Sequence, residues 1–216
     1  MARLLPVVPP ALPDPADQYR ALSFRNLNNV LRLYFNRVVN SINALTGVNG
    51  GQYVECPNGL FFNTSEQILA AINTATPVVY NATYLSNAVG LVSGSTSKIE
   101  ATVSGIYNFQ FSGQLVSTNS SSKTMYLWIR RDGTDIGYSS RGYTLSDSNA
   151  YFAVMWSFNI DLQEGQYVEL MCATTDTDLH FHAESATSPH TGIPSSVMSV
   201  NFISPLPDVL PTPPST

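Results

Sequence analysis

The sequence predicts a mainly β protein: an antiparallel two-sheet sandwich, preceded by an extended proline-rich arm and one long α-helix. Residues 105–115 alternate strictly between apolar and polar side chains, which is typical of a strand with one buried face. Residues 123–131 form a second apolar run that ends in Asp132-Gly133, and an Asp-Gly pair predicts a hairpin because Gly adopts the positive φ of its turn. Residues 150–160 form a third, aromatic strand.

The composition predicts a large core and an unusually uncharged surface. The chain has 216 residues, of which 44% are hydrophobic, so it is long and apolar enough to bury a sizeable core. Only 12% of the residues are charged, about half the usual share, and Ser, Thr and Asn replace Lys and Glu. Such surfaces suit extracellular and virion proteins better than cytosolic enzymes. The net charge of -5 disfavours a sequence-independent nucleic-acid-binding protein.

Cysteine usage and hydropathy exclude several other classes. Cys56 and Cys172 match no metal or redox motif. We interpret them as two buried free thiols; the alternative is a single disulfide. No apolar run approaches the ~20 residues of a membrane span, so no membrane partner is expected. Prolines interrupt the apolar start of the chain, and we therefore expect no secretion signal.

Residues 1–16 are predicted to form an extended anchoring arm. Five prolines disfavour a helix there, and they are interspersed with leucines and valines. A flexible linker would be more polar, so we expect this arm to lie on a neighbouring subunit or on a host assembly. The alternative is a disordered tail.

Residues 17–46 are predicted to form a long helix, with Asp17 as its N-cap and Gly47 just beyond its end. Its apolar positions are spaced three or four apart, a seven-residue repeat with one slip near the end. They are Phe24, Leu27, Leu31, Tyr34, Val38, Ile42 and Leu45. A helix with so apolar a seam is unstable alone in water. We expect self-association as a trimeric coiled coil; the alternative is packing on the sandwich of the same chain.

Residues 47–76 are predicted to form a connector that contains a short helix at 65–73, with the domain boundary near Pro77. From there to residue 204 the pattern is all β. The predicted strands are 78–84, 98–103, 106–116, 123–131, 134–139, 150–160, 166–174, 179–183 and 197–203. Their number and spacing predict a two-sheet sandwich. Residues 205–216 form a second proline-rich segment, predicted to be an extended tail.

Three motifs in the β region resemble the jelly roll shared by tumour necrosis factor and the globular heads of complement-type proteins. Residues 105–109 resemble that family's Gly-x-Tyr-x-Phe strand, and residues 125–133 resemble its strand that ends in a basic residue and an Asn/Asp-Gly turn. Residues 162–170 resemble its Leu-x-x-Gly-Asp-x-Val-x-Leu strand, with Gln166 in place of Asp. The glycine of the family's closing strand is absent near Phe202.

The resemblance implies a homotrimer of jelly rolls that pack round a threefold axis by their aromatic faces. The sequence has more aromatic residues than one sandwich interior needs, and aromatics are enriched at interfaces. We assign Tyr107, Tyr126 and Trp128 to this interface, together with the helix seam. Complement-type members carry a collagen stalk; here the long helix occupies its place.

The N-terminal segment is similar to helices that precede such heads in structural proteins of tailed bacteriophages. Residues 17–36 carry this second resemblance, from Asp17-Gln18-Tyr19 through Leu31-Arg32-Leu33-Tyr34-Phe35-Asn36. It implies a virion component, such as a capsid decoration or a short fibre. Its N-terminal arm and helix would attach it to other virion proteins of the capsid or tail, with the head displayed.

A receptor- or glycan-binding head of a tail fibre is the alternative function. Loops at 117–123, 140–149 and 174–178 are polar, and Tyr138 and Tyr143 are candidates to stack on the sugars of a host-surface glycan. The same loops suit plain solubility. A hydrolase acting on cell-surface polymers is a third hypothesis, but no nucleophile elbow, P-loop or glycosidase pair is present, so we expect no enzyme and no cofactor.

His180 and His182 are the weak candidates for metal ligands. On a strand their imidazoles share one face, which suits zinc, with Glu184 on the same face and His190 nearby. We prefer the alternative, in which the two histidines belong to an exposed polar face at the end of a strand.

Overall fold

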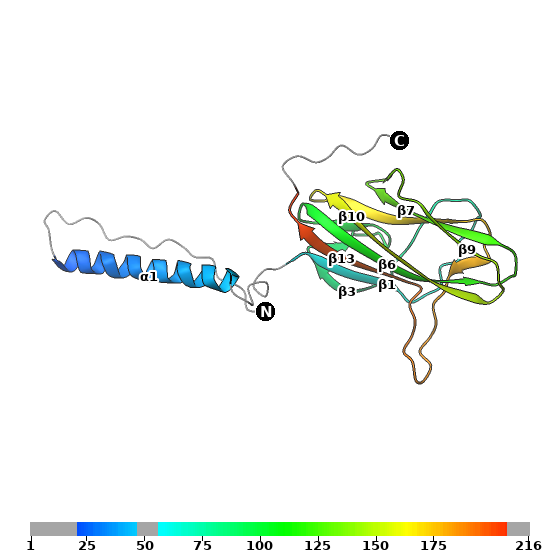
Figure 1. Ribbon diagram of the computed structural model, residues 1–216, viewed down its shortest axis with the longest axis horizontal. Helices are drawn as coiled ribbons and strands as arrows, with labels where there is room; N and C mark the ends of the chain where they lie inside the picture. Colours follow the sequence, from blue (N-terminus) through cyan, green and yellow to red (C-terminus); the bar gives the residue numbers. More distant parts are fainter. Residues whose placement is uncertain (1–20, 47–55, 207–216) are drawn as a thin grey trace. The chain divides into compact units, whose positions relative to one another are not determined.

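The computed structural model describes residues 21–46 and 56–206, which belong to two separate units (Figure 1). The first unit comprises residues 1–55 and the second residues 56–216. The predicted arm at 1–16, the N-cap Asp17 and nearly all of the tail at 205–216 lie outside the described residues.

The first unit contains helix α1, Ala21–Thr46, whose end coincides with the predicted one. Three arginines are the only charged residues in these 26 positions, and apolar side chains recur round much of the helix. The predicted seam residues Leu27, Leu31, Tyr34 and Val38 are half-buried, while Phe24 and Ile42 are about 50% and 51% exposed. Among the described residues, no helix is both long enough and apolar enough to cross a membrane.

The second unit is a sandwich of two antiparallel sheets. The six-stranded sheet has the order β10-β6-β13-β1-β3, with β12 also paired to β6. Its strands are β10 (Ala150–Leu162), β6 (Gly105–Ser117), β13 (Ser196–Ser204), β1 (Asn58–Asn63), β3 (Ala82–Asn87) and β12 (Leu179–Phe181). Figure 1 shows β10, β6, β13, β1 and β3 side by side in one layer.

The seven-stranded sheet has the order β4-β5-β11-β7-β8, with β2 paired to β11 and β9 to β7. Its strands are β4 (Val89–Leu91), β5 (Ile99–Ala101), β11 (Tyr167–Thr174), β7 (Lys123–Arg131), β8 (Thr134–Asp135), β2 (Thr76–Pro77) and β9 (Arg141–Leu145). The chain crosses repeatedly between the two sheets. The first and last strands of this unit, β1 and β13, pair with each other. This arrangement is compatible with a jelly roll.

The core lies between the sheets and is built from the inward side chains of the long strands. Phe109, Phe111 and Leu115 of β6 are at most 2% exposed, as their alternation with polar residues predicts. Met125 and Leu127 of β7 face them from the other sheet and are fully buried. The predicted fold class, a mainly β sandwich preceded by one helix, is therefore confirmed.

The predicted hairpin is also confirmed. Arg131 of β7 pairs with Thr134 of β8, and Asp132 and Gly133 between them have φ angles of 46° and 80°. The Asp132 carboxylate also accepts a hydrogen bond of 3.0 Å from the backbone N–H of Tyr167. The turn therefore fixes the register of β7 against β11 as well.

Residues 56–76, assigned from the sequence to a connector, contribute to the sandwich. Strand β1 pairs with both β13 and β3, and its Phe61 is fully buried in the core. The predicted helix at 65–73 is wrong: this segment is irregular and ends in a turn at 72–73, and Gln67 pairs with Phe181 through two backbone hydrogen bonds of 3.0 and 3.3 Å. Its side chain also bonds Val79 and two serines, which anchors the segment without a helix.

The other corrections concern short strands and one thiol. The predicted strand at 78–84 is replaced by β2 and β3, and β4 and β9 form where loops were expected. Both cysteines are free, but only Cys172 is buried; Cys56 is exposed. Between β12 and β13 a loop projects from the sandwich, closed by the bridges Glu184–Ile193 and Thr187–His190 (Figure 1).

Candidate functional site

The outer face of the six-stranded sheet is mostly polar and uncharged over three of its strands. Residues in register across a sheet point to the same side, so β10, β6 and β13 display rows of three side chains. The rows are Asn159-Asn108-Asn201, Ser157-Gln110-Ser199 and Met155-Ser112-Val197. None of these nine side chains is charged, and charged residues are depleted at the core of protein–protein interfaces.

Hydrogen bonds between these side chains hold the polar rows in place. Asn108 Nδ2 donates to Asn159 Oδ1 at 2.8 Å and to Ser157 Oγ at 3.0 Å. Gln110 Nε2 donates to Asn108 Oδ1 at 2.8 Å, and Asn201 Nδ2 donates to Ser199 Oγ at 3.2 Å. These hydrogen bonds join side chains of β6 and β10 to one another and fix the direction of the Asn108 amide.

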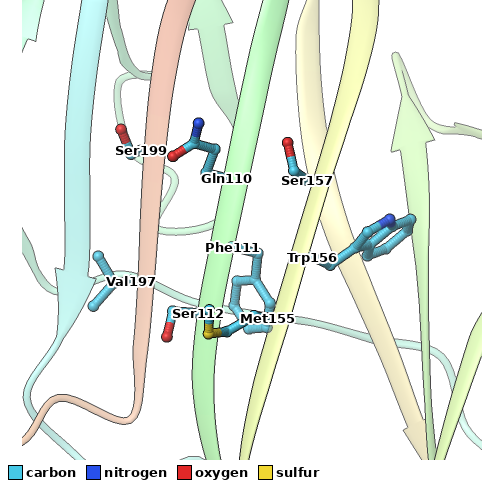
Figure 2. Close-up of a pocket in the computed structure, with 8 residues that line it drawn as sticks. All are labelled: Gln110, Phe111, Ser112, Met155, Trp156, Ser157, Val197 and Ser199. Atoms are coloured by element: carbon cyan, nitrogen blue, oxygen red, sulfur yellow. The ribbon is translucent and has the colours of Figure 1, made fainter.

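An open hollow of about 430 Å³ lies on this face (Figure 2). Gln110 and Ser112 of β6, Ser157 of β10 and Val197 of β13 line it. The Met155 side chain extends from β10 toward Ser112 with 75% of its surface exposed, whereas the Trp156 ring points away from the others. An apolar, flexible Met among small polar side chains suits contact with another protein surface.

The structure separates the three aromatic residues that were assigned to one interface. Tyr107 is fully buried inside the sandwich, and its hydroxyl donates to the Val103 carbonyl at 2.6 Å. Its ring is therefore not available to another chain, and this assignment is corrected. Tyr126 is 44% exposed and Trp128 half-buried, both on the outer face of the seven-stranded sheet. The outer face of the six-stranded sheet was not singled out from the sequence, because Ser, Asn and Gln in a sequence do not indicate an interface.

The helix provides a second exposed surface. Leu22, Leu33, Phe35, Val39 and Leu45 of α1 are 47–68% exposed. Full burial of such a side chain contributes about 1.5–3 kcal/mol, so this surface favours association strongly. Leu45 belongs to the predicted seam, whereas Leu22, Leu33, Phe35 and Val39 lie outside it, so the exposed apolar surface is wider than the predicted repeat.

The two tyrosines proposed to stack on sugars differ in availability. Tyr138 is 86% exposed and has a φ of 58°, a left-handed conformation that is unusual for a residue with a side chain. Ser139 follows it and bonds the Ile136 carbonyl at 2.7 Å, which closes the turn. Tyr143 is half-buried and its ring packs against Phe152 at 6.1 Å. Only Tyr138 offers a free aromatic face.

The two candidate histidines are brought together with a third group, Glu66. His182 Nδ1 donates to Glu66 Oε1 at 2.7 Å, and His180 Nε2 lies 4.0 Å from Glu66 Oε2. One ligand atom from each of the three residues lies within 4.8 Å of the other two. Glu184, expected on the same face, is not part of this group.

His180 is the most buried member of the group, with 7% of its surface exposed. Burial lowers the pKa of His180 because it disfavours the charged imidazolium, and the nearby Glu66 carboxylate opposes this only in part. The neutral imidazole is the form that binds a metal. Within the part of the chain that the structure describes, His180 Nδ1 is buried without a hydrogen-bond partner. The Tyr151 ring packs edge-on against His182 at 5.3 Å.

Sequence reasoning missed Glu66 because nothing local connects it to the histidines, which follow more than 110 residues later. The link is the backbone pairing of Gln67 with Phe181, in a segment that the sequence predicts to be helical. No signal in the sequence could have identified that pairing.

No protein-family model matches the chain, and no curated protein matches it. The functional conclusion therefore rests on the geometry and on the motifs of the sequence.

Proposed function

We propose that the protein is a homotrimeric structural protein of a tailed-bacteriophage virion, a capsid decoration or short fibre. Its N-terminal arm and helix attach it to other virion proteins, and the sandwich is the displayed head. The exposed apolar surface of α1 carries this proposal. A helix whose leucines, valines and aromatics remain about half exposed needs a partner, and the seven-residue spacing of its seam fits copies of itself.

Two further observations support the proposal. The sandwich is compatible with the jelly roll of the family that the β motifs resemble, and that family implies three copies round one axis. The uncharged outer face of the six-stranded sheet, with the exposed Met155 on its edge strand β10, suits contact between heads.

Native mass spectrometry tests the association. We expect a species of three times the 23.5 kDa chain mass at micromolar concentration. Leu31→Asp places a charge in the half-buried seam and is expected to give a monomer. Asn36→Asp adds the same charge at an exposed position of the same helix and is expected to remain trimeric. A stable wild-type monomer, or equal behaviour of both variants, would contradict the proposal.

The attachment to a virion requires a separate test. Protein identification in purified phage particles, followed by location of the head in the density of intact particles, is expected to place it on the capsid or the tail. Absence from the particles would exclude the virion role even if the chain is trimeric.

Tyr138 supports a second candidate function, recognition of a host-surface glycan. Its ring is 86% exposed on a closed turn, so it is presented rigidly enough to stack on a sugar. Glycan-array and cell-binding assays with the full chain test this function. We expect Tyr138→Ala to abolish binding, and Tyr84→Ala, which removes a ring 73% exposed on β3, to preserve it. Absence of binding across hosts would leave the structural role alone.

A further inference from the structure

We propose that Glu66, His180 and His182 form a binding site for one divalent transition-metal cation of the Zn²⁺ class, with one coordination position open to solvent. The site lies on the outer surface of the six-stranded sheet, where the segment before β2 meets the end of β12. It is independent of the proposed trimer, because all three ligands come from one chain.

Backbone pairing places the three side chains on one face. Gln67 pairs antiparallel with Phe181, so Glu66 lies opposite His182 and diagonal to His180. The neighbours of a paired residue point to the side opposite to its own side chain. Phe181 points into the core and is fully buried, and both histidines therefore face outward, toward Glu66.

The distances from Glu66 to the two histidines lie on either side of the value that a tetrahedral ion requires. Ligand atoms at 2.0–2.1 Å from Zn²⁺ lie about 3.3 Å from one another. Glu66 Oε1 is 2.7 Å from His182 Nδ1, and Glu66 Oε2 is 4.0 Å from His180 Nε2. A small movement of the Glu66 side chain toward His180 would bring the longer distance closer to that value. Glu66 is the most exposed ligand, with 43% of its side chain accessible, so it is free to make that shift.

The fold does not satisfy His180 by itself. Only 7% of the residue is exposed, and its Nε2 lies 4.0 Å from Glu66 Oε2, which is too far for a hydrogen bond. A metal ion between these two atoms would bind both of them. The ion would not change the environment of Nδ1, which has no hydrogen-bond partner among the described residues.

The ligand types select the class of metal. Two imidazoles and one carboxylate suit Zn²⁺, Co²⁺, Ni²⁺ or Cu²⁺, whereas Ca²⁺ and Mg²⁺ prefer oxygen ligands alone. Three protein ligands leave a fourth position for water or for a group from another molecule. Bound metal would join the segment before β2 to β12 and thereby stabilise the sandwich.

Isothermal titration of the full-length, tag-free chain with Zn²⁺ tests the site, in a Cys56→Ser background because an exposed thiol also binds zinc. We expect one ion per chain, a higher Tm with Zn²⁺, and visible absorption bands of tetrahedral Co²⁺ when Co²⁺ replaces it. Glu66→Gln and His182→Gln are expected to weaken binding by at least about 10-fold, the lower end of the range for outer-shell partners alone. Both residues are partly exposed, so these variants avoid the core.

Two matched variants serve as controls. Glu184→Gln removes a carboxylate that follows His182 closely in sequence, and His190→Ala removes an imidazole from the tip of the projecting loop. Both should bind Zn²⁺ like the parent chain. Lack of saturable binding by the parent would overturn the proposal. So would unchanged binding in Glu66→Gln and His182→Gln, or equal losses in the controls.

Discussion

Tyr80 and Tyr107 show how a single hydrogen bond decides the contribution of a buried residue. Their rings are 1% and 0% exposed, and burial raises the pKa of both hydroxyls. The Tyr107 hydroxyl donates to the Val103 carbonyl at 2.6 Å, whereas the Tyr80 hydroxyl has no hydrogen-bond partner among the described residues. An unpaired buried hydroxyl costs about 1–3 kcal/mol, while a formed hydrogen bond contributes about 1 kcal/mol.

Phenylalanine substitutions at these two positions should therefore change the free energy of unfolding differently. We expect Tyr107→Phe to lower the free energy of unfolding by about 1 kcal/mol, because the Val103 carbonyl loses its donor. Tyr80→Phe should leave it unchanged or raise it by about 1 kcal/mol, because it removes an unsatisfied group. Urea unfolding followed by tryptophan fluorescence measures both. A clear loss in Tyr80→Phe would show that its hydroxyl has a partner.

The two thiols should differ in reactivity. Burial raises the pKa of Cys172 to about 12, so almost none of it is the reactive thiolate near neutral pH. Cys56 is exposed. In native protein at pH 8 we expect a chromogenic disulfide reagent to modify one thiol per chain, and two in denaturant. Cys56→Ser should reduce the native count to zero; two fast-reacting native thiols would contradict the burial of Cys172.

At the scale of elements, Gly105 at the start of β6 allows the last strand to pack closely. A Cβ at this position would lie 2.9 Å from the Ser204 carbonyl oxygen and would overlap the Phe202 ring. Phe202 in turn packs edge-on against Tyr107 at 5.5 Å, so it has little room to move. Glycine is required here because Phe202 and Ser204 approach the backbone closely, and not because of a positive φ, which Gly105 does not have.

Gly105→Ala should therefore lower the free energy of unfolding by about 1–3 kcal/mol, the usual cost of overpacking. Gly90→Ala is the matched control: its Cβ would meet Ser86 Oγ at 3.5 Å, an ordinary contact. That variant should be neutral or slightly stabilising, because alanine restricts the unfolded chain. Thermal unfolding of both variants measures the difference, and equal Tm values would contradict the packing at Gly105.

The long elements could be predicted because their signals are local. Strand β7 has its predicted bounds, and β6 and β10 differ from their predicted bounds by one or two residues at an end. These strands could be predicted because apolar and polar side chains alternate along the sequence of each one. Short β1 and β9 were missed because they form only where longer strands pair with them. The same limit applies to the candidate site: His180 and His182 follow from strand spacing, but Glu66 depends on a partner far away in sequence.

At the scale of the molecule, the helix and the sandwich belong to two different compact units of the chain. The core cluster of the sandwich draws its residues from Phe61 to Val200 and includes none from α1. The described chain divides at residue 56 into two units. The stability of the head should therefore not depend on the helix. The association of copies of the chain should depend on it.

A fragment that starts at Cys56 separates these two properties. We expect it to unfold with the tryptophan fluorescence transition of the full chain, because both tryptophans and the whole core lie within it. We also expect it to be monomeric at micromolar concentration by native mass spectrometry, because the exposed apolar helix is gone. A fragment that remains trimeric would transfer the association to the sandwich, with the outer face of β10, β6 and β13 as the interface to mutate next. A fragment that fails to fold would show that the core needs residues before Cys56.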